Sequence, residues 1–328
     1  MLCEVKKAGV LLILFVVLLA VAVIAEAQQP TKVWRVGLSH VGLDHVPPSL
    51  EPLRQELKKL GYQEGKNILL DWRNLPDEEA ALVTAKQFVR EGYDVIVAFE
   101  NQTIRAAKAS TTQVPVVFLH ATDPLADGFV TNMARPEGNL TGFFGIGDMP
   151  AKRLELFKEI VPKLRRILVP FDNKDPVTPR YLGEIRKTSG GLKLHLVERA
   201  ATVQDEVEKV FAAIKPSDVD GVFPGSPNLN LKFSALMVRL SGEKRVPLAA
   251  HRGEWAEKGA LFSYAHDIAT VGPLAARYID RIFKGAKPSD LPVQEPSRFE
   301  FVINLKTAKQ IALTIPPNVL ARADKVIK

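Results

Sequence analysis

"VWRVGLSH" at residues 33–40 decides the fold, because this β-rich run breaks into a polar loop and "RRILVPFD" at 165–172 repeats the same design. Two more pairs follow in the same order: "YDVIVAFEN" (93–101) with "VDGVFPGSPN" (219–228), and "VPVVFLHATD" (114–123) with "VPLAAHRGEW" (246–255). The offset is about 125–135 residues each time, which is the size of one α/β lobe. We therefore expect two similar lobes.

Helix-like stretches separate the strand-like runs. "LRQELKKL" (53–60) ends at Gly61, as expected at a helix C-terminus, and 77–91 is amphipathic with acidic residues at its start. Strands that alternate with helices predict an α/β fold with parallel sheets and helices on both faces. Further strands are expected at 67–74, 166–171, 192–197, 219–223 and 247–250, and further helices at 102–111, 124–136, 151–162, 178–187, 203–214 and 229–242. Residues 138–146 are expected to lead out of the first lobe.

The tail after residue 267 continues neither lobe. It contains a helix-like stretch (268–285), a proline-rich segment, a strand-like run (298–305) and a final helical stretch. We expect the helix to join the first lobe and the strand to join the second. The predicted fold is therefore two Rossmann-like lobes joined by a three-crossing hinge. The crossings are expected near 142–146, 264–268 and 291–298, with lobe 1 at 33–143 plus about 266–290 and lobe 2 at 144–265 plus about 298–328.

The N-terminus has the pattern of an export signal. Two lysines precede an apolar run over 8–25, and "AEA" at 25–27 offers a small-x-small cleavage site. We expect a signal peptide over 1–27. The apolar run is also near the lower limit for a membrane span, so an uncleaved anchor is the alternative. An exported protein without an anchor is retained only where an outer membrane encloses it, which predicts a periplasmic location.

Composition narrows the class of protein. The 328 residues are 46% hydrophobic and 25% charged, which is typical of a globular domain pair. The formal charge of +7 is dispersed, without a basic block interleaved with aromatic residues, so nucleic acid is not an expected partner. Cys3, the only cysteine, lies before the apolar run. We therefore expect no disulfide, no thiolate nucleophile and no lipid anchor on a cysteine after the leader.

The loops after the strands are the candidate site, because ligands of open parallel sheets bind outside the carboxyl ends of the strands. Short polar side chains and helix N-termini in these loops suit a small polar solute. The candidate ligand-binding residues are Ser39, His40, Glu100, Asn101, Thr103, Thr122, Asp123, Phe171, Asp172, Asn173, Ser226, Asn228, Arg252 and Tyr264. Those that precede helices have a second interpretation as N-caps, and the aromatic ones have a second interpretation as core residues.

Three acidic residues limit the ligand. Glu100, Asp123 and Asp172 all fall at strand ends that are expected to face the cleft. A carboxylate there competes with an anionic ligand for the helix N-terminus. If Glu100 faces the cleft, we expect a ligand with an amine or several hydroxyls, and we do not expect an all-anionic ligand such as phosphate or sulfate.

Several segments resemble the periplasmic-binding-protein-like ABC transporter substrate-binding family, some of whose members bind aromatic amino acids. The most specific are "RPEGNLTG" (135–142) and "FVINLKTAKQIALTIPPNVLARADKVI" (301–327). The resemblance implies a type I bilobal fold that holds a solute between its lobes and delivers it to an inner-membrane permease powered by a cytoplasmic ATPase. Asp123 and Tyr264 match the family pattern, whereas the loops at 99–103, 171–176 and 251–255 depart from it.

The sequence therefore predicts a solute receptor that closes by hinge motion around a polar or amino-acid-like molecule. Asp123 is expected to hold an amine or hydroxyl, N–H groups near 101–103 and 226–228 to hold polar oxygens, and Phe171 or Tyr264 to cover an apolar part. The usual catalytic and nucleotide motifs are absent, so we expect no enzyme, and we expect no cofactor or metal. We also expect a monomer.

Two other functions stay open at this point. One is a periplasmic sensory module that reports its ligand to a kinase or chemoreceptor. The other is an exported enzyme in which His40, Glu100 and Asp123 meet as acid–base groups.

Overall fold

One parallel sheet of five strands organises the first lobe. In spatial order its strands are β2 (Ile68–Leu75), β1 (Trp34–Val41), β3 (Val95–Phe99), β4 (Val116–Ala121) and β5 (Leu140–Phe144). All neighbouring strands run parallel. β3 and β4 are buried along their whole length, as expected for apolar strands that are covered on both faces.

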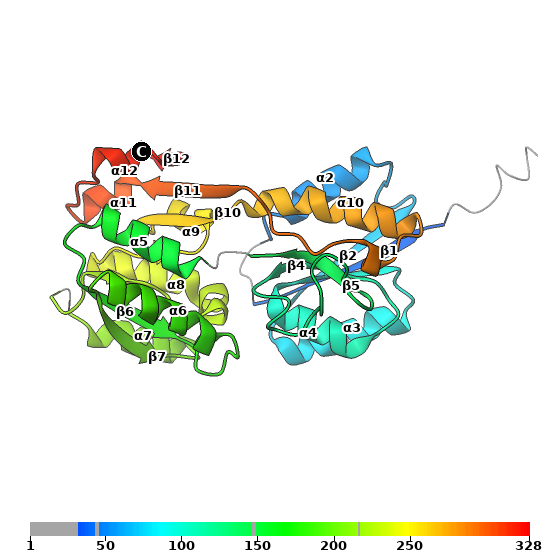
Figure 1. Ribbon diagram of the computed structural model, residues 1–328, viewed down its shortest axis with the longest axis horizontal. Helices are drawn as coiled ribbons and strands as arrows, with labels where there is room; N and C mark the ends of the chain where they lie inside the picture. Colours follow the sequence, from blue (N-terminus) through cyan, green and yellow to red (C-terminus); the bar gives the residue numbers. More distant parts are fainter. Residues whose placement is uncertain (1–31, 43–45, 146–148, 216) are drawn as a thin grey trace, which may run out of the picture.

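The computed structural model describes residues 32–42, 46–145, 149–215 and 217–328, which form two lobes side by side (Figure 1). The predicted leader at 1–27 lies outside these residues. Within the described ranges, no helix is long and apolar enough to cross a membrane.

Helices cover both faces of the first sheet. α2 (Leu50–Lys59) and α10 (Val271–Phe283) lie on one face, whereas α3 (Glu78–Arg90) and α4 (Glu100–Ser110) lie on the other (Figure 1). α2 and α10 bury Leu53, Leu57 and Ile279 in one core cluster with β1 and β3. α10 therefore brings the chain after residue 267 back onto the first lobe.

The second lobe is built from two sheets joined by a bridge between Val222 and Leu248. One has the order β7 (His195–Ala200), β6 (Arg166–Phe171), β8 (Gly221–Val222). The other has the order β12 (Lys325–Ile327), β11 (Phe299–Asn304), β10 (Phe262–His266), β9 (Ala249–Ala250). The helices of this lobe are α5 (Pro150–Ile160), α6 (Thr178–Gly191), α7 (Gln204–Ala213), α8 (Pro227–Lys244), α9 (Gly253–Glu257), α11 (Leu305–Gln310) and α12 (Pro317–Leu320).

Three segments connect the lobes, so the predicted two-lobed α/β fold is the observed one. One follows β5 and runs through 146–148, which lie outside the described residues. One follows β10 through the short 3-10 turn Ile268–Thr270, and one precedes β11 after a second such turn at Pro288–Asp290. The segments touch one another at the hinge. A Cβ on Gly145 would lie 2.8 Å from Glu295 Oε1 and 3.1 Å from His266 Nε2.

The second lobe departs from a wholly parallel sheet. β11 runs antiparallel to β10, whereas β9–β10 and β11–β12 are parallel. The reason is the hinge: β10 leaves the lobe towards the hinge and β11 enters from it, so the two strands must run in opposite directions.

Two local expectations for the first lobe were wrong. The expected helix at 124–136 is a set of turns, because Gly128 takes a φ of +68° after a single turn that Asp123 caps through Ala126 N–H. The segment expected only to lead out of the lobe contains β5, a full member of the sheet. Gly142 permits this pairing, since a Cβ there would lie 2.0 Å from the backbone oxygen of Phe118.

We predict that Gly272→Ala destabilises the first lobe. A Cβ at this position would lie 2.2 Å from Ser49 O and 2.7 Å from Leu53 N, so α10 would have to move away from α2. The expected loss is about 1–3 kcal/mol, measured by urea unfolding. Gly183→Ala is the matched control, because that helical glycine is exposed and nothing lies within 4 Å of its Cβ position. It should be neutral or stabilise by about 0.5–1 kcal/mol. Equal stability of the two variants would contradict the assigned packing.

Candidate functional site

A buried ion pair joins the strand-end loops of the two lobes. Glu100 begins α4 directly after β3 of the first lobe, and Arg252 follows β9 of the second. The Nη2 atom of Arg252 donates a short hydrogen bond to Glu100 Oε1. The Arg252 side chain is 5% exposed and the Glu100 side chain 14% exposed. Each lobe therefore contributes one charge to the middle of the cleft.

Glu100 has a raised pKa and an unfavourable backbone conformation. Burial raises the pKa of its carboxyl group, and the positive charge and hydrogen bond of Arg252 oppose that rise. The Glu100 backbone has a φ of +67°, a left-handed conformation that costs energy for a residue with a side chain. His120, at the end of the neighbouring strand β4, has the same φ of +67°. Strained residues of this kind concentrate at functional sites.

A small cavity lies beside the ion pair. Its lining comes from both lobes and consists of Glu100, Thr122, Pro227, Asn230, Leu231, His251 and Arg252. Its volume is about 10 Å³, which is room for about one water molecule. Asn230 is 2% exposed, and neither its Oδ1 nor its Nδ2 has a hydrogen-bond partner among the described residues. A buried amide without partners is costly unless something else satisfies it.

A second bridge between the lobes lies nearer to solvent. Arg180 of α6 approaches Asp123 at 3.6 Å and Asp127 at 3.4 Å. Asn101 donates to Asp127 at 2.9 Å and accepts from the N–H of Thr122 at 3.0 Å. Asp123 and Asn101 therefore shape the loop after β4, and Asp123 also meets a cation from the other lobe.

The predicted loops of the second lobe hold one another in place. The Asp172 N–H donates to Ser226 Oγ at 3.0 Å, and the Thr202 hydroxyl donates to Asp172 Oδ1 at 3.1 Å. The same hydroxyl lies 3.1 Å from Asn173 Oδ1. The Asn228 N–H donates to Asp175, a buried residue that the sequence analysis missed. These side chains fix the loops that carry the cleft lining.

The side chains of the remaining candidate residues make their contacts within their own lobes. Ser39 is buried in β1, and His40 accepts from Trp72 Nε1 at 3.3 Å. The Thr103 hydroxyl in α4 donates back to the carbonyl of Phe99, the N-cap residue of that helix. Phe171 packs against the core of the second lobe, and Tyr264 stacks on Phe299 with ring centroids 5.5 Å apart. None of these side chains lines the small cavity beside the ion pair.

Two buried histidines, His120 and His251, were not among the candidate ligand-binding residues. Burial lowers the pKa of His120 well below its usual range, with further lowering by Arg252, His40 and His266. Burial, followed by the charges of Arg252 and Arg153, does the same to His251. The repeat contained a signal, because each of the two matching Val-Pro runs contains one histidine, His120 or His251.

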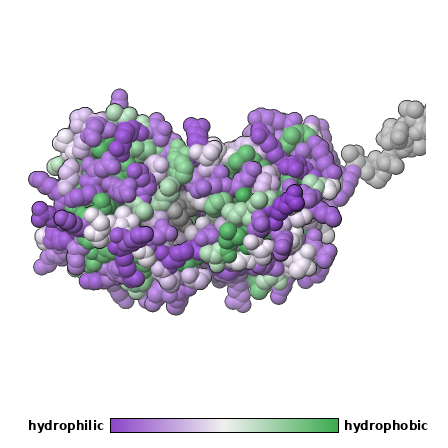
Figure 2. All heavy atoms as spheres, viewed as in Figure 1, coloured by the Kyte–Doolittle hydropathy of each residue, from purple (hydrophilic) through white to green (hydrophobic). Residues whose placement is uncertain are grey.

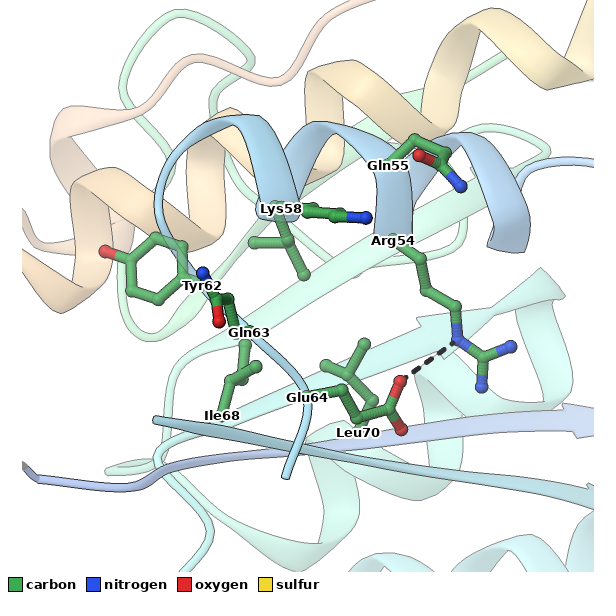
Figure 3. Close-up of a pocket in the computed structure, with 9 residues that line it drawn as sticks. Arg54, Gln55, Lys58, Tyr62, Gln63, Glu64, Ile68 and Leu70 are labelled. Carbon is green, nitrogen blue, oxygen red and sulfur yellow. Dashed lines mark ion pairs between the residues drawn. The ribbon is translucent and has the colours of Figure 1, made fainter. Parts of the chain in front are cut away.

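A larger hollow lies away from the cleft, between α2 and β2, with a volume of about 360 Å³ (Figure 3). Figure 3 shows Arg54 reaching towards Glu64, 3.7 Å from Nε to Oε2.

Hydrophilic residues dominate the visible face of both lobes (Figure 2). Across the described part of the chain, no group of three or more His, Cys, Asp or Glu side chains is placed to hold a metal ion.

We predict that stability falls as the pH drops below 6.5. His120 and His251 have folded-state pKa values below their unfolded value of 6.5, so below that pH the unfolded chain binds more protons. Each histidine should contribute a loss of up to about 1.4 kcal/mol per pH unit. Urea unfolding at pH 7.5, 6.5 and 5.5 measures the slope. His120→Gln and His251→Gln should flatten it, and the exposed His195→Gln is the control. If the slope is unchanged in both cleft variants, the pH dependence of stability does not come from His120 and His251.

The chain matches known proteins over nearly its whole length. The family model for ABC transporter substrate-binding proteins matches residues 36–327. A tyrosine-binding protein of Clostridioides difficile is 24% identical over 281 residues, which cover 84% of this chain and 80% of that protein.

Solved structures give the same result. A conserved domain protein of Vibrio cholerae has a TM-score of 0.81 and 28% identity, covering 90% of this chain and all of the other. An ABC domain of a Streptococcus species, determined in complex with L-Trp, has a TM-score of 0.78 and 24% identity, with 89% and 100% covered. Both structures support the bilobal fold, and the match to the family model over residues 36–327 identifies the family. The chain belongs to the ABC transporter substrate-binding protein family.

Proposed function

We propose that this protein is the periplasmic receptor of an ABC importer, which captures a small amino-acid-like molecule between its lobes. It hands that molecule to an inner-membrane permease driven by a cytoplasmic ATPase, and it acts as a monomer. Its family consists of solute-binding proteins and not of enzymes, as the sequence predicted. The observation that carries the proposal is the buried Glu100–Arg252 pair, which places opposite charges from the two lobes in one cleft.

The hinge supplies the motion that capture requires. We propose that 33–143 with about 266–290 moves as one body and 144–265 with about 298–328 as the other. Rotation about three short crossings separates two rigid lobes without breaking either core. The ion pairs of Arg252 and Arg180 are the contacts that opening must break.

The relatives support an amino-acid-like ligand. One relative is named a tyrosine-binding protein, and another was solved with L-Trp bound. Three of the strand-end loops depart from the family pattern, at 99–103, 171–176 and 251–255. We therefore propose the ligand class from the relatives and leave the side-chain preference to experiment.

We predict that a member of an L-amino-acid panel stabilises the protein. A ligand at 100 times its Kd adds about 2.7 kcal/mol, which raises Tm by several degrees in a protein of this size. Differential scanning fluorimetry of unfolded and refolded protein measures the shift without residual ligand. The panel also contains amines, aromatic acids and sugars, and mass spectrometry identifies any molecule that co-purifies from periplasmic extract. The proposal fails if no class shifts Tm and no molecule co-purifies.

We predict that the leader is removed on export. Cleavage after Ala27 leaves Gln28 as the first residue of the protein in the periplasmic fraction. Intact-mass analysis of that fraction should give the mass of 28–328. The full-length mass in the membrane fraction would instead support the anchored alternative.

A further inference from the structure

The hollow between α2 and β2 lies on the outside of the first lobe and is large enough for a small molecule (Figure 3). Its volume is about 360 Å³, and sites for small molecules begin at about 300 Å³. None of the residues that line it also lines the small cavity in the cleft. The hollow is therefore a separate candidate site, and its lining decides what it can bind.

The floor of the hollow is aliphatic. Leu57 of α2 and Ile68 and Leu70 of β2 line it, and all three belong to the core of the first lobe. Ile68 and Leu70 are alternate residues of one strand, so both side chains lie on the same face of the sheet. Tyr62 adds its ring, while its hydroxyl points away and donates to Asp280 at 2.9 Å. A hydrocarbon chain could cover this floor and remove it from water.

Two cations of α2 lie beside this floor. Arg54 and Lys58 are four residues apart on the helix, so they share one of its faces and repel each other. Figure 3 shows both on the α2 side of the hollow, opposite Ile68 and Leu70. In the part of the chain that the structure describes, the Lys58 side chain has no ion pair and no hydrogen bond.

One carboxylate, that of Glu64, lies among the lining residues. Glu64 Oε2 is 3.7 Å from Arg54 Nε, which is too far for a hydrogen bond. Arg54 Nε is buried and has no hydrogen-bond partner among the described residues. The two side chains are 36% and 48% exposed, so their attraction contributes little. With Lys58, the lining carries two positive charges and one negative charge, which favours the binding of one more anion.

The other acidic residues of α2 do not neutralise this excess charge. Glu51 accepts a hydrogen bond from Gln55 at 2.6 Å. Glu56 pairs with Lys59 at 3.3 Å and with Arg277 at 3.0 Å. Neither carboxylate lines the hollow.

We infer that the hollow is a second ligand site, which binds an aliphatic monocarboxylate. Arg54 and Lys58 hold the carboxylate group, and the hydrocarbon chain covers the aliphatic floor. One negative charge matches the excess positive charge of the lining. Since the site lies outside the cleft, the inference does not rest on the proposed function.

The first test varies chain length and charge on the unaltered protein, which is unfolded and refolded beforehand to remove bound molecules. Calorimetry compares hexanoate, octanoate and decanoate, below their micelle concentrations, with acetate and 1-octanol. Affinity should rise by up to about fourfold for each methylene group that the floor covers. Acetate should show no binding, and 1-octanol should bind about tenfold more weakly than octanoate, because it lacks the charge. An affinity of 1-octanol within about threefold of octanoate, or no effect of chain length, overturns the inference.

The second test locates the bound carboxylate by NMR of methyl-labelled protein. Octanoate should shift the methyl resonances of Leu57, Ile68 and Leu70, which line the hollow, and leave those of Leu231, which lines the cavity in the cleft. The reverse pattern overturns the inference. Because the two places have different reporters, this inference and the receptor function succeed or fail separately.

The third test uses variants whose effects should have opposite signs. Lys58→Gln should weaken octanoate binding about tenfold, because it removes a charge-assisted hydrogen bond. Glu64→Gln should strengthen binding, because it removes the competing carboxylate. Lys59→Gln is the matched control, since this neighbour on α2 pairs with Glu56 and does not line the hollow. All three substituted side chains are exposed, so the fold should tolerate the changes. Equal affinities of Lys58→Gln and Lys59→Gln for octanoate would contradict the assigned site.

Discussion

The buried ion pair between Glu100 and Arg252 is the constraint on which the function of this structure depends. Removing two charges from water is costly, and their attraction compensates only where both partners stay in place. Here the partners belong to different lobes, so the cost is tied to the position of the hinge. In the proposed function, opening separates the two charges and closing brings them back into contact. We propose that this pair links the motion of the lobes to the contents of the cleft.

The fold explains why these two residues meet. The carboxyl ends of parallel strands gather at one edge of each sheet, and the three crossings turn the two edges towards each other. Glu100 follows the buried strand β3 and has a left-handed backbone conformation. Arg252 lies at the entrance to α9, where it is almost fully buried. The packing of the surrounding cores compensates for the backbone strain at Glu100 and for the loss of solvation at Arg252.

A comparison with Arg180 shows how burial changes the energetic importance of an ion pair between the lobes. Arg180 also bridges the lobes, through Asp123 and Asp127, but its side chain is 34% exposed. Ion pairs with that much exposure contribute little, because water screens them. Asp123, which the sequence predicted to hold an amine or hydroxyl of the ligand, lies in this outer bridge. The inner pair is formed by residues in two of the loops that depart from the family pattern, at 99–103 and 251–255.

The sequence by itself determined the two lobes, the strand-end loops and the family, because these follow from local periodicity and from a repeat. Glu100 and Arg252 were both among the candidates, since each stands directly after a strand. Their pairing, the buried histidines and the unpartnered Asn230 were decided only by the tertiary structure. The physical reason is that 152 residues separate Glu100 from Arg252 in sequence. The burial of the two charges depends on how the two lobes pack against each other, and local sequence patterns do not predict that packing.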